Sequence, residues 1–223
     1  GTWNLAFAVE GTGSVAGQTG NVYVGVDAVS LDAGPNCEAA APYSLTVSYP
    51  PTDYGDLVLG VISSSTASQM ASTDVRIGTN ASDWEISDPS DSNANKDDTT
   101  GTDDEDLTIP TFTIGSTTNF TVPVTLNTAA LNGNAATVAV FVNWNGDGNT
   151  SGTNETLAAQ TVTTNGSSNV VFAMTPPAGV APGSRFMRVR INEGTSTAGF
   201  NGASPLKGEV EDYLVTVACP TVA

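Results

Sequence analysis

The chain has no histidine, and its 223 residues include only two cysteines, two lysines and four arginines. Without histidine, a Ser-His-Asp triad, a Cys-His dyad, a His-ligated zinc site and a proximal haem ligand are all excluded. The shortage of basic residues argues against nucleic acid and anionic lipid as partners, because both are bound through clustered Lys and Arg. We therefore expect no nucleic-acid partner.

Long apolar runs are also missing. No run approaches the roughly 18 residues that indicate a membrane-spanning helix, so we expect no insertion into a membrane. The sequence shows no secretory signal peptide either. We expect a monomeric domain that belongs to a longer protein.

Acidic and small polar residues are what the chain has in excess. It carries 23 Asp and Glu for a net charge of −17, and it contains 31 Thr, 20 Ser and 18 Asn. Thr suits the surface of a β-sheet, and an acidic surface poor in lysine is typical of secreted bacterial proteins. This composition predicts a secreted or cell-surface protein.

Short β-type segments recur along the chain, and Gly, Pro or runs of Thr and Ser interrupt any longer helical pattern. This spacing predicts an all-β fold, an antiparallel β-sandwich with long calcium-binding loops. A few helical turns near 66–71 are compatible with the pattern. We expect strands at 3–9, 21–26, 43–49, 57–62, 74–78, 108–114, 119–126, 137–144, 156–163, 168–174, 185–192 and 211–218.

The first 33 residues differ from the rest by their glycine-rich stretch at 11–20. We interpret 1–33 as the tail of a preceding domain or as edge strands of the sandwich, and 34–223 as the sandwich itself. Cys37 and Cys219 bracket that second segment, which predicts a disulfide. Closing so long a loop contributes about 5 kcal/mol in the chain-entropy model. Two buried free thiols are the alternative.

Carboxylates gather in four places, the densest of which is 88–106 with eight acids and one lysine. The alternative for such a run is a solvated loop. However, the run ends in the sequence DDED directly before an expected strand, where several oxygens can converge on one cation. Asp53 and Asp56 of DYGD form a second, smaller group. Because Ca²⁺ prefers six to eight oxygen ligands, these groups predict calcium sites.

The third group, NWNGDGN, has the spacing of a calcium loop. With Asn143 at position 1, Asn145, Asp147 and Gly148 fall at positions 3, 5 and 6, but no acid occupies position 12 and the nearest one is Glu155. A tight turn between two strands is the alternative, because Asn, Asp and Gly favour turns for their own reasons.

The fourth group is GEVEDY, at 208–213. Alternate residues of a strand share a face, so Glu209 and Glu211 should point one way and Asp212 should lie on the other side beside Val210. Two like charges so close favour a cation between them. A carboxylate pair for glycoside hydrolysis is the enzymatic alternative, but the chain offers no aromatic cleft for it, and we expect no enzyme.

The four groups give one set of expected Ca²⁺ ligands. It comprises Asp53, Asp56, Asp97, Asp98, Asp103, Asp104, Asp106, Asn145, Asp147, Asn149, Glu209, Glu211 and Asp212.

The order DYGD, DDED, WNGDGN, APGSRFMRVRI and GEVEDY resembles the GEVED domain family of bacterial surface and secreted proteins, over residues 53–217. The chain departs from the family pattern at Asn143, where an acid is frequent, and at the offset Glu155. The resemblance implies a calcium-supported β-sandwich. Some similar domains, in the adhesins of the repeats-in-toxin class, bind peptides and so capture partner proteins on other cells.

From this resemblance we expect an extracellular calcium-dependent module of a large bacterial adhesin. Its ligand is expected to be a peptide or protein on another cell surface, which places a carboxylate on an exposed calcium ringed by Asp103, Glu209 and Glu211. One alternative is a calcium-stiffened spacer without a ligand. Another is a carbohydrate-binding accessory domain that uses exposed aromatic residues such as Trp84 and Trp144.

Overall fold

The computed structural model describes residues 52–55, 57, 67–80, 82 and 107–221. All of them belong to one compact unit of the chain, Pro51–Ala223. The strands expected at 3–9, 21–26 and 43–49, and the domain boundary expected after residue 33, lie outside the described residues.

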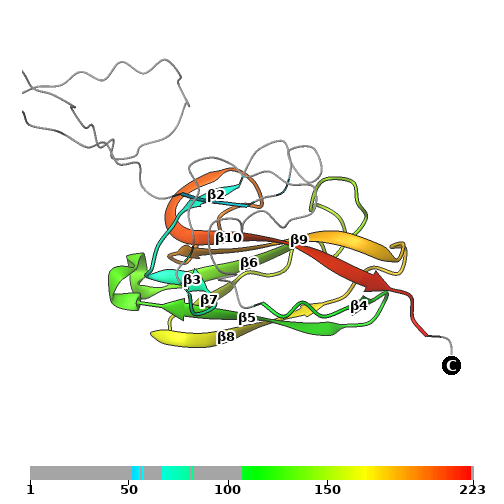
Figure 1. Cartoon of the computed structure of the whole chain (residues 1–223), viewed down its shortest axis with the longest axis horizontal. Coiled ribbons are helices and arrows are strands. Elements are labelled where there is room, and N and C mark those ends of the chain that lie inside the picture. Colours follow the sequence, from blue (N-terminus) through cyan, green and yellow to red (C-terminus); the bar gives the residue numbers. More distant parts are fainter. Residues whose placement is uncertain (1–51, 56, 58–66, 81, 83–106, 222–223) are drawn as a thin grey trace, which may run out of the picture. The chain divides into compact units, whose positions relative to one another are not determined.

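The described residues form an all-β sandwich of two sheets, which Figure 1 shows as stacked layers. The larger sheet has the strand order β1-β2-β10-β9-β6-β7, and β4 pairs with the far end of β10. Its strands are β1 (Thr52–Tyr54), β2 (Ser68–Met70), β4 (Phe112–Thr113), β6 (Ala136–Asn143), β7 (Gln160–Val162), β9 (Gly183–Glu193) and β10 (Ala203–Ala218).

The smaller sheet has the order β3-β5-β8 and is antiparallel throughout. Alternation of buried and exposed residues along β5 and β8 turns one face of this sheet to the core and the other to solvent. Two single 3-10 turns, η2 (Thr128–Ala130) and η3 (Asn132–Asn134), follow β5. The strands are β3 (Val75–Ile77), β5 (Thr118–Leu126) and β8 (Gly166–Met174).

The apolar core lies between the two sheets. Phe120 and Val122 of β5 and Phe172 of β8 pack there with Val140 and Val189 of the larger sheet, and all five side chains are at most 5% exposed. Every residue of β6, which lies between β9 and β7, is buried, so both faces of this strand are covered. Burial of these side chains is the main stabilising contribution to the sandwich.

Strand β10 is the element that positions the functional residues. It pairs with β9 over Gly208–Val217, begins in parallel beside β2 and ends in parallel beside β4. The sequence predicts a purely antiparallel sandwich. The structure differs because the 16-residue strand β10 pairs in parallel with a short strand at each of its ends. The five residues 208–212 between these neighbours are all buried.

Sequence periodicity predicts β3, β5, β6, β8 and β9 to within a few residues of their bounds. Within the strand expected at 108–114, only Phe112–Thr113 is a strand, because Pro110 has no N–H for a ladder. The helical turns considered near 66–71 are wrong, since β2 occupies Ser68–Met70. No helix in the described part is long and apolar enough to cross a membrane.

Candidate metal centre

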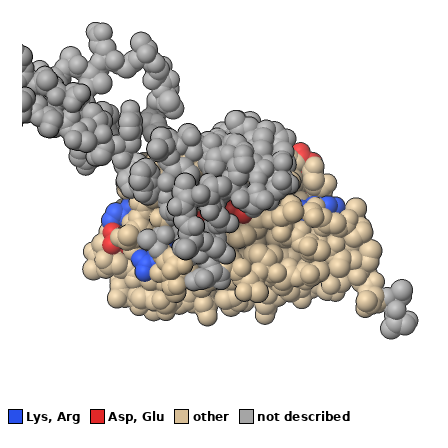
Figure 2. Space-filling view, in the orientation of Figure 1, with Lys and Arg blue, Asp and Glu red and all other residues tan. Residues whose placement is uncertain are grey.

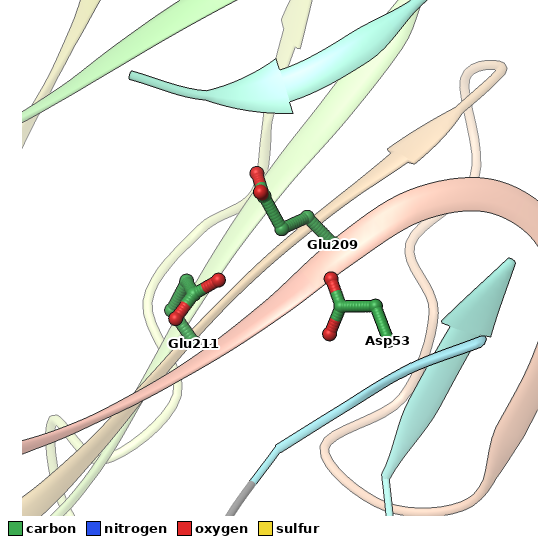
Figure 3. A group of neighbouring side chains, drawn as sticks. All are labelled: Asp53, Glu209 and Glu211. Carbon is green, nitrogen blue, oxygen red and sulfur yellow. The ribbon is translucent and has the colours of Figure 1, made fainter. Parts of the chain in front are cut away.

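Three buried carboxylates converge at the start of the β9–β10 ladder (Figure 3). Glu209 and Glu211 belong to β10 and Asp53 belongs to β1, and one oxygen of each lies within 4.8 Å of one oxygen of the others. Their residues are only 2%, 0% and 4% exposed for Asp53, Glu209 and Glu211. We call this group the carboxylate trio.

Both glutamates of GEVEDY belong to the trio because side chains two residues apart in a strand point to the same face. Glu209 lies opposite Ile191 and Glu211 lies opposite Val189, and both of these β9 residues are in the core between the sheets. Directly opposed residues of an antiparallel pair share a face. The sequence prediction that Glu209 and Glu211 point the same way is confirmed.

Hydrogen bonds fix two members of the trio across long sequence distances. The N–H of Val210 donates to both carboxylate oxygens of Asp53, at 3.3 and 3.2 Å. The N–H of Ile77 on β3 donates to Glu209 Oε2. Asp53 thus accepts a backbone N–H at the edge of β10 that neither β2 nor β4 covers. Glu209 connects the larger sheet to the smaller one.

The donor set fits a hard divalent cation. Two oxygens bound to the same calcium ion lie at most about 5 Å apart, twice the roughly 2.4 Å bond, and the trio meets this limit with its 4.8 Å span. Three carboxylates offer up to six oxygens, and there is no nitrogen or sulfur ligand of the kind that zinc prefers among them. Such a set suits Ca²⁺ best.

Electrostatics also favour a cation at this place. Two unit charges 4.8 Å apart, the upper limit of the oxygen–oxygen distances in the trio, repel by about 3.5 kcal/mol at an effective dielectric constant of about 20. The trio contains three such pairs. A divalent ion among the carboxylates replaces this repulsion by attraction.

On the opposite face of β10, Asp212 forms a buried ion pair with Arg188 of β9. Arg188 Nε and Nη2 donate to Asp212 Oδ1 and Oδ2 at 2.7 and 2.6 Å, and both side chains are at most 1% exposed. The N–H of Leu57 also donates to Asp212 Oδ2. Asp212 was predicted as a metal ligand and, as also predicted, lies on the other side of the strand from Glu209 and Glu211, where it binds an arginine.

Gly55 of DYGD covers this buried ion pair. A Cβ atom at Gly55 would lie 2.7 Å from Asp212 Oδ2 and 2.9 Å from Arg188 Nη2. Only glycine therefore lets the segment after β1 approach the pair closely. DYGD therefore contains both Asp53 of the trio and Gly55, which packs against the ion pair.

Arg190 is a second buried arginine on this face, two residues from Arg188. Its guanidinium donates to the carbonyl oxygens of Gly199, Gly202 and Ser68, which connects the loop before β10 to β2. Burial lowers the pKa of Arg190 to about 10, an effect that nearby Arg188 strengthens and the charge of Asp53 opposes. Arg190 therefore remains charged at neutral pH.

The formal charges of this region leave an excess that matches one divalent ion. Among the described residues it contains four buried carboxylates and two buried guanidinium groups, which sum to −2. The acids are the trio and Asp212, and the bases are Arg188 and Arg190. One Ca²⁺ would make the whole group neutral.

The NWNGDGN loop uses its side-chain oxygens differently. Asn143 Oδ1 accepts the N–H groups of Gly146 and Asp147, Asn145 Oδ1 accepts that of Asp147, and Asp147 Oδ1 accepts that of Asn149. These are the local bonds of an Asx turn. The oxygens that a calcium loop would direct to an ion here accept backbone N–H groups.

Glu155, the offset acid of this loop, is 1% exposed and closes it from inside. Its Oε1 and Oε2 accept the N–H groups of Asn145 and Gly152. Trp144 is also buried, at 1% exposure, and donates its indole N–H to the carbonyl of Asn154 at 2.9 Å. Trp144 is therefore not the exposed aromatic residue that the carbohydrate alternative needs.

Of the remaining expected site residues, Cys219 is described and the others lie outside the described part. Cys219 is exposed just after β10, while its expected partner Cys37 lies outside the described residues, so the disulfide stays a prediction. Trp84 and the expected ligands Asp56, Asp97, Asp98, Asp103, Asp104 and Asp106 also lie outside the described residues.

Sequence reasoning quoted the arginine-bearing segment APGSRFMRVRI for the resemblance but assigned no role to Arg188, Arg190 or Gln69. The signal for the arginines was present, because two charged residues at alternate positions of an apolar strand share one face and need a common partner. Gln69 carries no such signal, since it stands in a three-residue strand without periodicity. It is 1% exposed and its Nε2 donates to the carbonyl of Ile191 at 3.0 Å.

Few of the described charges reach the surface. Only eight of the 23 acidic residues are in the described part, and five of these eight are buried. Figure 2 accordingly shows a described surface that is mostly uncharged in this view. Most acidic side chains of the described part therefore lie in the interior and not on the surface.

Comparison with known proteins agrees with the resemblance seen in the motifs. No curated protein matches the chain. Residues 137–216, which run from β6 through most of β10, match the family model of the GEVED domain. The matched part contains Glu209 and Glu211 of the trio, whereas Asp53 precedes it. Residues 137–216 thus support a place for this part of the chain in the GEVED family.

Proposed function

We propose that the chain is a calcium-dependent module of a secreted or cell-surface bacterial protein, and that its first ion is held by the carboxylate trio. One observation carries this proposal: three buried carboxylates lie within 4.8 Å of one another. In the interior of a sandwich this arrangement is costly without a cation and favourable with one.

The main role of an ion at the trio would be structural, since it would hold separate strands together. Asp53 comes from β1, Glu209 and Glu211 come from β10, and Glu209 also accepts the N–H of Ile77 from the smaller sheet. Calcium at this point ties together two strands that are about 150 residues apart in the chain and supports the contact between the sheets. Oxygen ligands and flexible geometry are what Ca²⁺ requires.

The fuller proposal is that this module binds a peptide or protein ligand as part of a large adhesin. Its support is the match to the GEVED domain together with the adhesin domains that the motifs resemble. Glu209 and Glu211 are too buried to leave an open coordination position to solvent. Capture of a ligand carboxylate directly by calcium would therefore need a further ion, for which Asp103 is the sequence-based candidate.

Thermal unfolding with and without calcium tests the first step. An ion present at a thousand times its dissociation constant, bound to the folded state only, adds about 4 kcal/mol of stability. We expect EDTA to lower the melting temperature and added CaCl₂ to restore it, with MgCl₂ as the control. An unchanged melting curve in EDTA would contradict the proposal.

Peptide and glycan arrays, each probed in CaCl₂ and in EDTA, test the second step. We expect calcium-dependent binding of acidic peptides, with a free C-terminal carboxylate preferred over its amide. Calcium-dependent glycan binding without peptide binding would instead favour the carbohydrate-binding alternative.

The burial of the trio specifically favours one alternative, a calcium-stiffened spacer without a ligand. A fully enclosed ion stabilises the fold but offers nothing to a partner. For the spacer we expect the same loss of melting temperature in EDTA and no calcium-dependent signal on either array.

A further inference from the structure

Gln69, next to Asp53 of the carboxylate trio, has a buried side-chain amide whose oxygen accepts no hydrogen bond within the described part of the chain. Its Nε2 donates to the carbonyl oxygen of Ile191 at 3.0 Å. Its Oε1 is buried and has no hydrogen-bond partner in the described part of the chain. Because a buried amide oxygen without a partner is costly, nearly all such groups in proteins are satisfied by a donor, a water or an ion.

Strand register places Gln69 next to Asp53. The two residues are directly opposed in the antiparallel pair β1–β2, so their side chains lie on the same face as neighbours. Asp53 is a member of the trio. Gln69 therefore approaches the trio from the side of β2.

The hydrogen bond of Gln69 places its amide group beside the backbone of Ile191, the residue paired with Glu209. Ile191, which accepts the Nε2 proton, is the β9 residue directly opposite Glu209. A carbonyl oxygen can only accept, so this contact fixes the orientation of the amide and directs Oε1 away from Ile191. The amide thus lies among residues that carry or adjoin the trio.

Gly208, the first residue of GEVEDY, provides the room for this amide. A Cβ atom at position 208 would lie 2.8 Å from Gln69 Nε2 and would overlap the carbonyl oxygen of Ile191. Any other residue would therefore displace the amide from its place.

We propose that Gln69 Oε1 is a fourth oxygen ligand of the cation that the trio binds, a role that rests on the proposed function. Amide carbonyl oxygens are common ligands of Ca²⁺, and a neutral ligand adds an oxygen without adding to the charge excess of −2. Four side chains from β1, β2 and β10 then enclose the ion. A protein cage of this kind suits Ca²⁺ better than Mg²⁺, which keeps most of its water.

The experiment compares calcium affinity, measured by isothermal titration calorimetry on EDTA-treated protein, between the wild type and Gln69→Met. Met has a similar volume and no amide oxygen. We expect at least a tenfold loss of affinity at one site. Gln160→Met is the matched control, because Gln160 also donates its Nε2 to a strand carbonyl, that of Val171 at 2.7 Å, from an exposed edge. It should keep wild-type affinity.

Gln69→Glu separates a ligand from a merely structural side chain. Glu keeps an oxygen for the ion but loses the N–H donated to Ile191. If Gln69 is a ligand, this variant binds calcium within about threefold of the wild type or more tightly. If only the hydrogen bond to Ile191 matters, it loses as much affinity as Gln69→Met, and the proposal is overturned. Gln69→Glu also decides the question should Gln69→Met fail to fold.

Terbium luminescence lifetimes in H₂O and D₂O give a second readout, the number of water molecules on the bound ion. We expect Gln69→Met to add one water relative to the wild type. A wild type that binds no calcium would overturn the proposed function. A wild type that binds calcium as tightly as Gln69→Met does, with the same number of waters, would overturn only the role of Gln69.

Discussion

Replacement of Arg188 by Met should be among the most destabilising single changes in the described part. The variant loses the two bonds to Asp212 at 2.7 and 2.6 Å, the bond to the carbonyl of Phe200 at 2.9 Å and the stacking of the guanidinium over the Phe200 ring at 5.0 Å. It leaves the Asp212 carboxylate buried with the N–H of Leu57. Removing one partner of a buried ion pair costs about 3–5 kcal/mol.

Urea unfolding in excess calcium measures this cost, and a double-mutant cycle assigns it. Removal of both partners in Arg188→Met/Asp212→Leu should cost less than the sum of the single changes, with a coupling free energy of roughly 2–3 kcal/mol. Arg185→Met is the control, because Arg185 of the same strand donates to three backbone carbonyls and is only partly buried. If Arg188→Met cost no more than this control, the reasoning would be refuted.

Three further predictions follow from other contacts. The hydrogen bond from Lys207 lowers the pKa of Asp74 below 3.8, so the stability that this pair contributes is present above that pH and is lost as the pH falls through the lowered pKa. Because the pair is partly exposed, Lys207→Met should remove only about 0.2–1 kcal/mol at pH 7 in urea unfolding, and less as the pH falls through the lowered pKa of Asp74. Gly55→Ala should cost about 1–3 kcal/mol by crowding the buried ion pair, whereas Gly179→Ala, which meets no atom within 4 Å, should be neutral in the same assay. If the expected disulfide forms, the exposed Cys219 of unreduced protein will resist alkylation as followed by mass spectrometry, and modification without prior reduction would contradict it.

Strand periodicity predicts most of the sandwich because the long strands bury alternate residues in one core. The alternation in GEVEDY even predicts which acids share a face, and the positions of Glu209, Glu211 and Asp212 follow it. The same rule does not find β1 and β2, which have three residues each: β1 pairs with β2, and β2 pairs in turn with the distant β10. No local pattern reports such pairing.

Local sequence patterns also do not show which residues come together in the candidate site. DYGD and GEVEDY are both visible as acidic motifs, but sequence does not tell that Asp53 reaches Glu209 and Glu211 while Asp212 binds Arg188. These choices depend on which strand edges meet across more than 150 residues of chain. A neutral ligand candidate such as Gln69 is harder still, because only its burial and its unused oxygen distinguish it from other glutamines.

Calcium binding to Glu211→Gln tests the central claim most directly. Glu211 is a member of the trio, and Gln keeps its size while removing its charge. Glu193→Gln, which changes a partly buried acid whose carboxylate accepts backbone N–H groups, is the control. By calorimetry on EDTA-treated protein, we predict that Glu211→Gln loses one calcium per chain or at least tenfold in affinity, while the control keeps wild-type binding. Full wild-type stoichiometry and affinity in Glu211→Gln would contradict the assignment of the trio as a calcium site.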